Sequence, residues 1–234
     1  MTCSGVSQGQ ILISLLFGDK LNTPSLEFGI HAGLNMTTIS NIEPSEYAGF
    51  LSLGFYFDMR INDKWWFHPE LLVKSTNGAR GLEPYEVGVP DLDEVLVNSE
   101  VRREIGYFQF PLLIKYKFKY GFGIEGGIQP AMRTSATDIF SHSIIEDEDL
   151  TFENDLNDDI TRFDFGLTGG ISWRPYKTQG VTFVARYTYG LVDILKDNPG
   201  EPQRNSGFVI SGLIPIGVKK AEAARAEKEA NGEE

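Results

Sequence analysis

The chain has 234 residues, a formal net charge of −12 at pH 7, and a composition of 41% hydrophobic and 23% charged residues. This composition is too apolar for a disordered chain, and the acidic excess argues against a nucleic-acid partner. The single cysteine, Cys3, excludes an internal disulfide framework and a cysteine-based zinc site. No apolar run approaches the roughly 20 residues of a membrane helix. Many glycines and aromatic residues favour short strands and turns instead.

The N-terminus contains no complete secretory signal. Residues 1–7 are small and polar, but Gly5-Val6-Ser7 fits the pattern that precedes a signal-peptidase cut. We interpret 1–7 as the remnant of a signal peptide, and the alternative is an ordinary polar cytoplasmic N-terminus. Residues 8–25 are predicted to form a periplasmic or interfacial segment. Its apolar run, Ile11 to Phe17, either rests on the membrane rim, begins a plug, or is left over from the signal core.

From Leu26 onward the hydrophobic pattern has a period of two, which predicts strands. In the first segment the apolar residues from Leu26 to Met36 share one face, opposite Glu27, His31 and Asn35. Seven further alternating segments cover 51–60, 65–76, 108–118, 122–133, 163–174, 181–189 and 208–216. Eight such strands are the minimum for a closed antiparallel barrel.

The predicted connections alternate in length. Short turns join strands two and three, four and five, and six and seven, whereas long loops are expected at 39–46, 79–102, 136–159 and 195–205. Short periplasmic turns and long extracellular loops are typical of outer-membrane barrels. A soluble lipocalin-type barrel has the same strand count, so the two architectures must be separated by which face lies outside.

Two groups of residues favour the membrane barrel over the lipocalin. Charges of both signs in mid-strand can pair in a narrow lumen, whereas a lipocalin needs an apolar interior. The expected polar lumen core consists of Arg60, Glu70, Lys74, Lys115, Glu125, Arg133 and Arg186. Aromatic residues beside the short turns are typical of the girdle at a membrane interface. This girdle is expected to contain Trp65, Trp66, Tyr116, Phe118, Tyr120, Trp173 and Tyr176.

Several motifs in residues 26–217 resemble one known family. They include the segments FGIHAGLN at 28–35, HPELL at 68–72, FQFPLLIKY at 108–116 and RYTYGL at 186–191. Together they are similar to PorT-like outer-membrane β-barrel proteins. The resemblance implies an all-β, eight-stranded, up-and-down transmembrane barrel in the outer membrane of a Gram-negative bacterium, surrounded by outer-membrane lipid. The founding member of that family is tied to type IX protein secretion.

The C-terminal end departs from this pattern. The resemblance implies a last strand that ends on an aromatic residue, but here the barrel region, 26–217, ends in Leu213-Ile214-Pro215-Ile216-Gly217. Residues 218–234 are rich in alanine, glutamate and lysine, and they predict a short helical, charged periplasmic tail.

Few residues suggest catalysis. The three histidines lie on different segments, and His31 and His68 are expected to be hydrogen-bonding residues of the lumen. Ser141-His142-Ser143 is the local hint of a hydrolase, and no Ser-His-Asp triad or metal-spaced cluster accompanies it. We therefore predict no catalytic residues and no cofactor.

The predicted loop at 136–159 carries nine acidic residues and no lysine or arginine. Asp155, Asn157 and Asp159 match the first ligand positions of a calcium loop, but Ile160 replaces the glycine at the sharp turn. The alternative is a solvated acidic loop that meets a basic partner. Apolar residues expected to contact a partner stand among the acids: Ile139, Phe140, Ile144, Ile145 and Phe152. They could equally fold back as a cap over the barrel mouth.

The sequence therefore predicts a non-enzymatic outer-membrane barrel with a structural or protein-interaction role, as in a secretion or uptake complex. The protein partner is expected to bind the long loops or the terminal periplasmic segments. The alternatives are a soluble lipocalin-like ligand carrier and a small outer-membrane hydrolase.

Overall fold

The computed structural model describes residues 23, 25–145, 148–175 and 180–216. For 142–145 and 148–150 it describes the backbone alone. The predicted signal remnant, most of the segment at 8–25, Tyr176 and the C-terminal tail lie outside the described residues.

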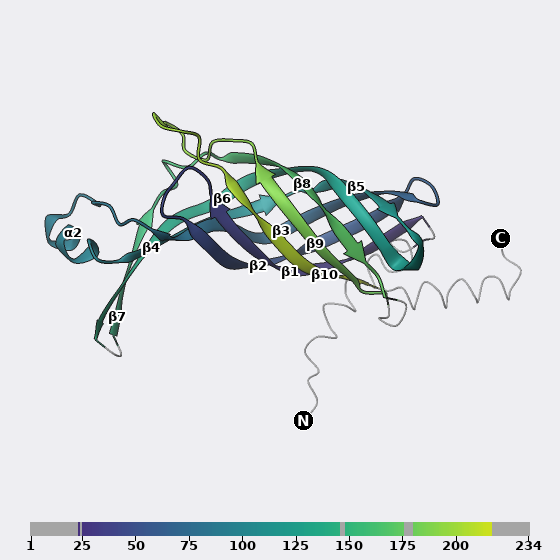
Figure 1. The fold of residues 1–234 in the computed structure, drawn as a ribbon, viewed down its shortest axis with the longest axis horizontal. Helices are drawn as coiled ribbons and strands as arrows, with labels where there is room; N and C mark the ends of the chain where they lie inside the picture. The colour runs from purple at the N-terminus through teal and green to yellow at the C-terminus, as the bar shows by residue number, and fades with distance from the viewer. Residues whose placement is uncertain (1–22, 24, 146–147, 176–179, 217–234) are drawn as a thin grey trace, which may run out of the picture.

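The described part of the chain is almost entirely β-structure (Figure 1). One short α-helix and one 3-10 turn interrupt the strands. In chain order the elements are β1 (Leu26–Ile39), β2 (Glu46–Arg60), β3 (Trp65–Leu82), α2 (Pro90–Leu96), β4 (Glu100–Gln109), β5 (Leu112–Lys117), η1 (Lys119–Gly121), β6 (Phe122–Ile145), β7 (Glu148–Asp155), β8 (Phe163–Trp173), β9 (Thr182–Gly190) and β10 (Asn205–Pro215).

The sheet closes on itself as a barrel of eight antiparallel wall strands. β1 pairs with β2 on one side and with β10 on the other, which joins the two ends of the sheet. β4 and β5 together form one wall strand, because both lie between β3 and β6 and are separated only by a break at Pro111. Proline has no backbone N–H to donate to the ladder, so the pairing is interrupted at that residue. The predicted fold class is confirmed.

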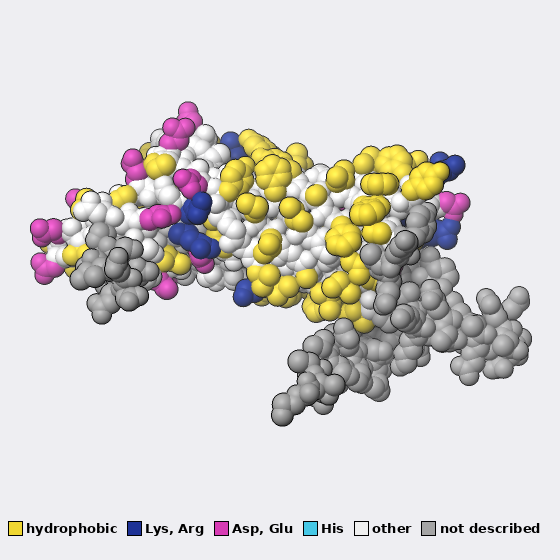
Figure 2. Space-filling view, turned by 60° about the horizontal axis from the view of Figure 1, so that its bottom comes forward, with side chains coloured by type: hydrophobic (Ala, Val, Ile, Leu, Met, Phe, Trp, Pro, Cys, Tyr) yellow, Lys and Arg dark blue, Asp and Glu magenta, His cyan; other side chains and the backbone are white. Residues whose placement is uncertain are grey.

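Alternation along each strand separates an apolar outer face from a polar inner one. On β5, Leu112 and Ile114 are about two-fifths exposed, while Lys115 between Ile114 and Tyr116 is 2% exposed. Hydrophobic side chains cover the wall of the barrel in Figure 2, and acidic side chains collect at the end that carries α2. The exposed apolar side chains are the outer surface that a membrane barrel presents to lipid.

The end with the long connections differs from the sequence expectation at 136–159. The expected loop is instead a β-hairpin, because β6 continues to Ile145 and β7 returns along it. The acidic residues did not prevent strand formation, because the side chains of this segment still alternate between two faces. Asp138 and Phe140 share the buried face, opposite Thr137, Ile139 and Ser141. The hairpin extends away from the barrel wall in Figure 1.

A compact apolar cluster, here called the mouth core, fills the barrel at this long-loop end. It brings together residues from β1, β3, β4, β6, α2 and the connections after β7 and β9. Its buried members are Ile39, Ala79, Leu82, Leu96, Val101, Ile105, Tyr107, Ala131, Ala136, Phe140, Leu156, Ile160 and Ile194.

None of the helices among the described residues is long and apolar enough to span a bilayer.

Candidate functional site

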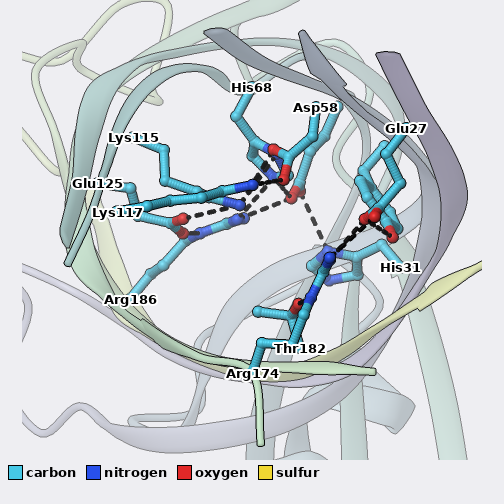
Figure 3. A network of polar contacts seen from close by, with 12 residues as sticks. Glu27, His31, Asp58, His68, Lys115, Lys117, Glu125, Arg174, Thr182 and Arg186 are labelled. Carbon is cyan, nitrogen blue, oxygen red and sulfur yellow. Dashed lines mark hydrogen bonds and ion pairs between the residues drawn. The ribbon is translucent and has the colours of Figure 1, made fainter. Parts of the chain in front are cut away.

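The half of the barrel interior nearer the short turns, here called the lower half, contains a network of charged side chains. We call it the lumen network. It consists of Asp58, His68, Glu70, Lys115, Lys117, Glu125 and Arg186, contributed by five different wall strands (Figure 3). The strands place these groups inward because each occupies the polar phase of its alternation. Six of the seven are nearly inaccessible to solvent, with Lys117 at the edge.

His68 is the centre of the network. Its Nδ1 lies 2.5 Å from Asp58 Oδ1, and its Nε2 lies 2.7 Å from Glu70 Oε1. The second oxygen of Glu70 lies 3.1 Å from Nδ1 of His31 on β1. The two histidines therefore link the carboxylates of β2 and β3 to each other and to the neighbouring strand β1.

Basic side chains compensate the carboxylates. Arg186 donates to Glu70 Oε1 at 2.7 Å and also to Glu125. Lys115 Nζ lies 3.2 Å from Asp58 Oδ1 and 3.4 Å from Glu125 Oε2, and Lys117 Nζ lies 3.1 Å from Asp58 Oδ2. Three carboxylates thus face two lysines and one arginine in addition to His68. Charges buried in this way are tolerated only when they are paired and hydrogen-bonded.

A second ion pair closes the lumen at the short-turn end. Arg174 donates two hydrogen bonds to Glu27, at 2.8 and 2.5 Å, and one to Thr182 Oγ1 at 2.6 Å. Tyr56 donates to Glu27 at 2.9 Å. These contacts join β1, β2, β9 and the residue after β8 across the barrel.

More open space remains at the short-turn end of the lumen than in its upper part. A cavity of ≈ 130 Å³ at the short-turn end is lined by Asp58, Lys117, Arg174 and Thr182, among others. The upper lumen is lined by amides and hydroxyls such as Gln109, Gln129 and Asn205, and leaves ≈ 20 Å³. That volume holds about one water molecule. The arrangement resembles a cross-linked plug and lacks the apolar chamber that a lipocalin-type carrier needs.

Four of the seven predicted lumen residues meet in the network: Glu70, Lys115, Glu125 and Arg186. Lys74 is exposed on the outer side. Leu53 of β2 pairs with Lys74 and the next residue, Gly54, pairs with Leu72, so β3 has one extra residue at this point and its alternation of inner and outer side chains changes after Leu72. Arg60, the last residue of β2, is exposed and pairs with Asp63 in the turn that follows. These two expectations were wrong.

Arg133 also lies apart from the network. Its Nη2 donates to the carbonyl oxygen of Asn157 at 2.8 Å, and its Nη1 contacts the Asn157 side-chain oxygen. This places Arg133 at the barrel mouth, under the connection that follows β7.

Sequence reasoning left Asp58 and Lys117 out of the lumen core, and it missed the pair formed by Glu27 and Arg174. All four stand in the polar phase of their strands or directly after them, so alternation was the available signal. Alternation does not say which residues meet across the barrel. That depends on the stagger between strands.

The described aromatic residues of the predicted girdle lie near the short turns, but they do not all face outward. Trp65 packs against Tyr116, and Tyr116 against Phe118, with centroid separations of 4.9 and 4.8 Å. Tyr120 and Trp173 are also exposed. Trp66 is in the inward phase of β3 with His68, and Lys117 Nζ lies 3.5 Å from its ring centroid. Trp66 is therefore not part of an outward girdle.

At the long-loop end, polar contacts attach the base of the β6–β7 hairpin to the barrel. Arg103 on β4 donates two hydrogen bonds to Asp138 on β6, at 2.8 and 2.7 Å. Tyr85 donates to the same carboxylate at 2.9 Å and accepts from Asn154 on β7 at 2.8 Å. Partial burial and the Asp138 carboxylate raise the pKa of Tyr85 to about 12.

The apolar residues predicted to meet a partner divide into two groups. Phe140 is completely buried in the mouth core, and half-buried Phe152 packs on it with ring centroids 6.0 Å apart. These two residues fold back over the barrel mouth as a cap, which was the alternative to a partner contact. The expectation that Phe140 faces a partner was wrong. Ile139 is on the opposite face of β6 and is half-buried, while the side chains of Ile144 and Ile145 lie outside the described part.

The calcium-like segment is arranged around a protein cation. The Asn157 side-chain oxygen contacts the Arg133 guanidinium, and Asp155 Oδ1 accepts from the Asn157 backbone N–H at 2.7 Å. Among the described residues, no group of three or more histidine, cysteine or acidic side chains is close enough to hold a metal ion. Of Ser141-His142-Ser143, the structure describes one side chain, that of exposed Ser141.

A family model described as an outer membrane protein beta-barrel domain matches residues 18–196. The chain belongs to this outer-membrane β-barrel family. It is accordingly a protein of the bacterial outer membrane, and the apolar outer face of its barrel contacts lipid. No curated protein matches its sequence.

Several solved outer-membrane proteins are similar to this chain in fold. Ail, the attachment invasion locus protein of Yersinia pestis, has 8% identity and a TM-score of 0.43, over 82% of this chain and 98% of Ail. Neisserial surface protein A has 12% identity and a TM-score of 0.42, over 80% and 96%. OprG from Pseudomonas aeruginosa has 13% identity and a TM-score of 0.33, over 81% and 91%.

Proposed function

We propose that this barrel is a non-enzymatic outer-membrane anchor that presents a protein-binding platform outside the cell. The observation that carries the proposal is the β6–β7 hairpin, which extends beyond the barrel and is fixed at its base by Arg103, Asp138 and Tyr85. A hairpin held in this way can meet a partner with little loss of conformational freedom.

The orientation is part of the proposal. Short turns face the periplasm and long connections face the outside in bacterial outer-membrane barrels. The hairpin, α2 and the acidic residues of the long-loop end would then face the medium. The exposed aromatic residues Trp65, Tyr120 and Trp173 would lie at the periplasmic interface.

The lumen supports binding over transport. Charged pairs cross its lower half, and the mouth core fills the upper end. An eight-stranded barrel is only wide enough for side chains to fill it. The protein would therefore act through its surface, not by conducting a solute.

The proposed role in a secretion or uptake complex rests on the sequence motifs. Similarity to PorT-like proteins supports membership of a multi-protein secretion or uptake complex, in which this barrel would contribute a binding surface. The partner would be a protein with a basic surface, because acidic side chains dominate the long-loop end (Figure 2).

Cross-linking on intact cells tests the proposal. We expect a surface-exposed cross-linker to join the wild-type barrel to one main protein. Replacing residues 141–151 by an Asn-Gly turn should remove that product, because the hairpin is shortened while Phe140 and Phe152 keep the mouth core closed. Heat-modifiable gel mobility should show that the barrel still assembles.

The matched control replaces residues 197–201, an exposed stretch of the connection between β9 and β10, by a turn of similar length. This variant should retain the cross-linked product. A partner that stays bound when the hairpin is shortened would show that the platform lies elsewhere.

A further inference from the structure

The outer edge of β7 is an unpaired strand edge. Among the described residues β7 pairs with β6 alone, whereas β6 at the same level also pairs with β4 on its other side. The Leu156 N–H donates to the Ala136 carbonyl at 2.9 Å, which fixes the alternation of the antiparallel ladder. By that alternation, Thr151, Glu153 and Asp155 direct their backbone N–H and C=O groups away from β6.

The charges that protect this edge against strand pairing are acidic, so they repel acidic strands and leave the edge open to a basic one. Natural edge strands are blunted by charged side chains, most often lysine, by proline, by β-bulges or by a covering element. The β7 segment, Glu148–Asp155, contains neither lysine nor proline. The wall strands below it have no such edge, because the ring is closed.

The two faces of β7 differ in chemistry. Phe152 and Asn154 are half-buried and contact Phe140 and Tyr85. Thr151, Glu153 and Asp155 are exposed on the other face. A strand added beside β7 would place alternate residues next to these two faces.

We propose that the outer edge of β7, Glu148–Asp155, binds an extended segment of the partner protein as an additional strand, with basic residues alternating with apolar ones. Shortening the hairpin removes Glu148–Thr151, which leaves too little of this edge for a strand to pair. This inference rests on the proposed function and specifies how the platform binds. Basic residues would lie beside Glu153 and Asp155, and apolar residues beside Phe152. Main-chain hydrogen bonds would supply affinity, and the alternating side chains would supply specificity.

Charge argues against a second copy of the same chain as the occupant. The β7 segment carries four acidic residues and no basic residue. Pairing two copies of this edge would set acid beside acid, which destabilises adjacent strands. A basic segment is attracted to the same edge.

A labelled synthetic peptide of alternating lysine and valine tests the proposal against the full chain in detergent micelles. We expect fluorescence anisotropy to show saturable binding that weakens as salt is raised. The same peptide with glutamate in place of lysine should not bind. Absence of binding by the lysine peptide would overturn the proposal.

The backbone contribution is tested by Thr151→Pro, which removes an N–H that does not pair with β6 and leaves the charge unchanged. Proline is tolerated on such an edge. Loss of one hydrogen bond, together with the steric block, should weaken peptide binding at least about tenfold, whereas Thr151→Val should bind normally. A peptide with N-methylated backbone amides should also bind poorly. If Thr151→Pro or N-methylation leaves the Kd unchanged, the contact is electrostatic only and strand addition is wrong.

The cell-surface experiment separates this inference from the proposed function. If shortening the hairpin removes the partner but Thr151→Pro retains it, the platform binds in another way and strand addition alone fails. If shortening the hairpin retains the partner, the proposed function fails whatever the peptide result.

Discussion

Arg103 and Asp138 form a bidentate ion pair between adjacent strands at the point where the hairpin leaves the barrel. The guanidinium Nε and Nη2 donate to separate carboxylate oxygens at 2.8 and 2.7 Å, and both residues are buried. A bidentate pair fixes direction as well as distance. It therefore determines how the hairpin is held relative to the wall.

Removing one member of this pair should loosen the hairpin. In Arg103→Leu the Asp138 carboxylate remains buried without its cation, which costs about 3–5 kcal/mol for a fully buried pair. We expect rapid proteolysis within the hairpin while the barrel keeps its heat-modifiable mobility. Tyr85→Phe, which removes one hydrogen bond, should cost about 1 kcal/mol and give much slower cleavage. Equal cleavage of the two variants would contradict the role of the ion pair.

The same site predicts a pH dependence. Tyr85 donates as the neutral phenol, and its pKa is raised from 10.0 to about 12 in the folded protein. The stabilisation that the Tyr85–Asp138 hydrogen bond gives to the folded protein should therefore be complete below pH 10 and be lost as pH rises through about 12. The ultraviolet difference between wild type and Tyr85→Phe should show one phenol that ionises late. Ionisation of that phenol near pH 10 would show that its contact with Asp138 does not form.

The lipid-facing assignment of β5 predicts a cost for a charge on that face. Leu112 is 37% exposed and lies on the same outer face of β5 as Ile114. Leu112→Arg should cost roughly 2–4 kcal/mol if the residue lies near the bilayer midplane. Urea unfolding from lipid vesicles measures this difference. Leu112→Phe keeps the face apolar and should cost far less, so equal costs would contradict lipid contact.

The lumen network predicts a large difference between two arginines. Arg186 pairs with Glu70 and Glu125, and its side chain is 3% exposed, whereas Arg60 pairs with Asp63 and is 40% exposed. Arg186→Leu should cost about 3–5 kcal/mol because two buried carboxylates lose the guanidinium that they share. Arg60→Ala should cost about 0–1 kcal/mol, as for other exposed pairs. Similar unfolding midpoints for both variants would show that the network does not stabilise the barrel.

The filled interior predicts a barrel without steady conductance. Reconstituted protein in a planar bilayer should show no sustained single-channel steps, because charged pairs and the mouth core leave space for about one water in the upper lumen. A general porin, measured in the same bilayer, provides the positive control. Sustained channels from the wild-type protein would require the plug to open.

The sequence by itself determined the class of fold and the two faces of its wall. Alternation is local, so Leu112 and Lys115 could be placed on opposite faces without knowledge of any partner strand. The mid-strand charges of both signs then indicated that the face of Lys115 is the interior. The same alternation predicted the eight wall strands and the polar interior. The acidic composition also placed charge at the long-loop end.

Only the tertiary structure decided which interior charges meet and where the pattern breaks. The contacts of Arg186 with Glu70 and Glu125 depend on the stagger of strands that lie far apart in the sequence. The register irregularity that turns Lys74 outward, and the pairing of β6 with β7, depend on neighbouring strands in the same way. A period of two specifies which side of a strand a residue occupies, whereas register between strands specifies what that residue touches.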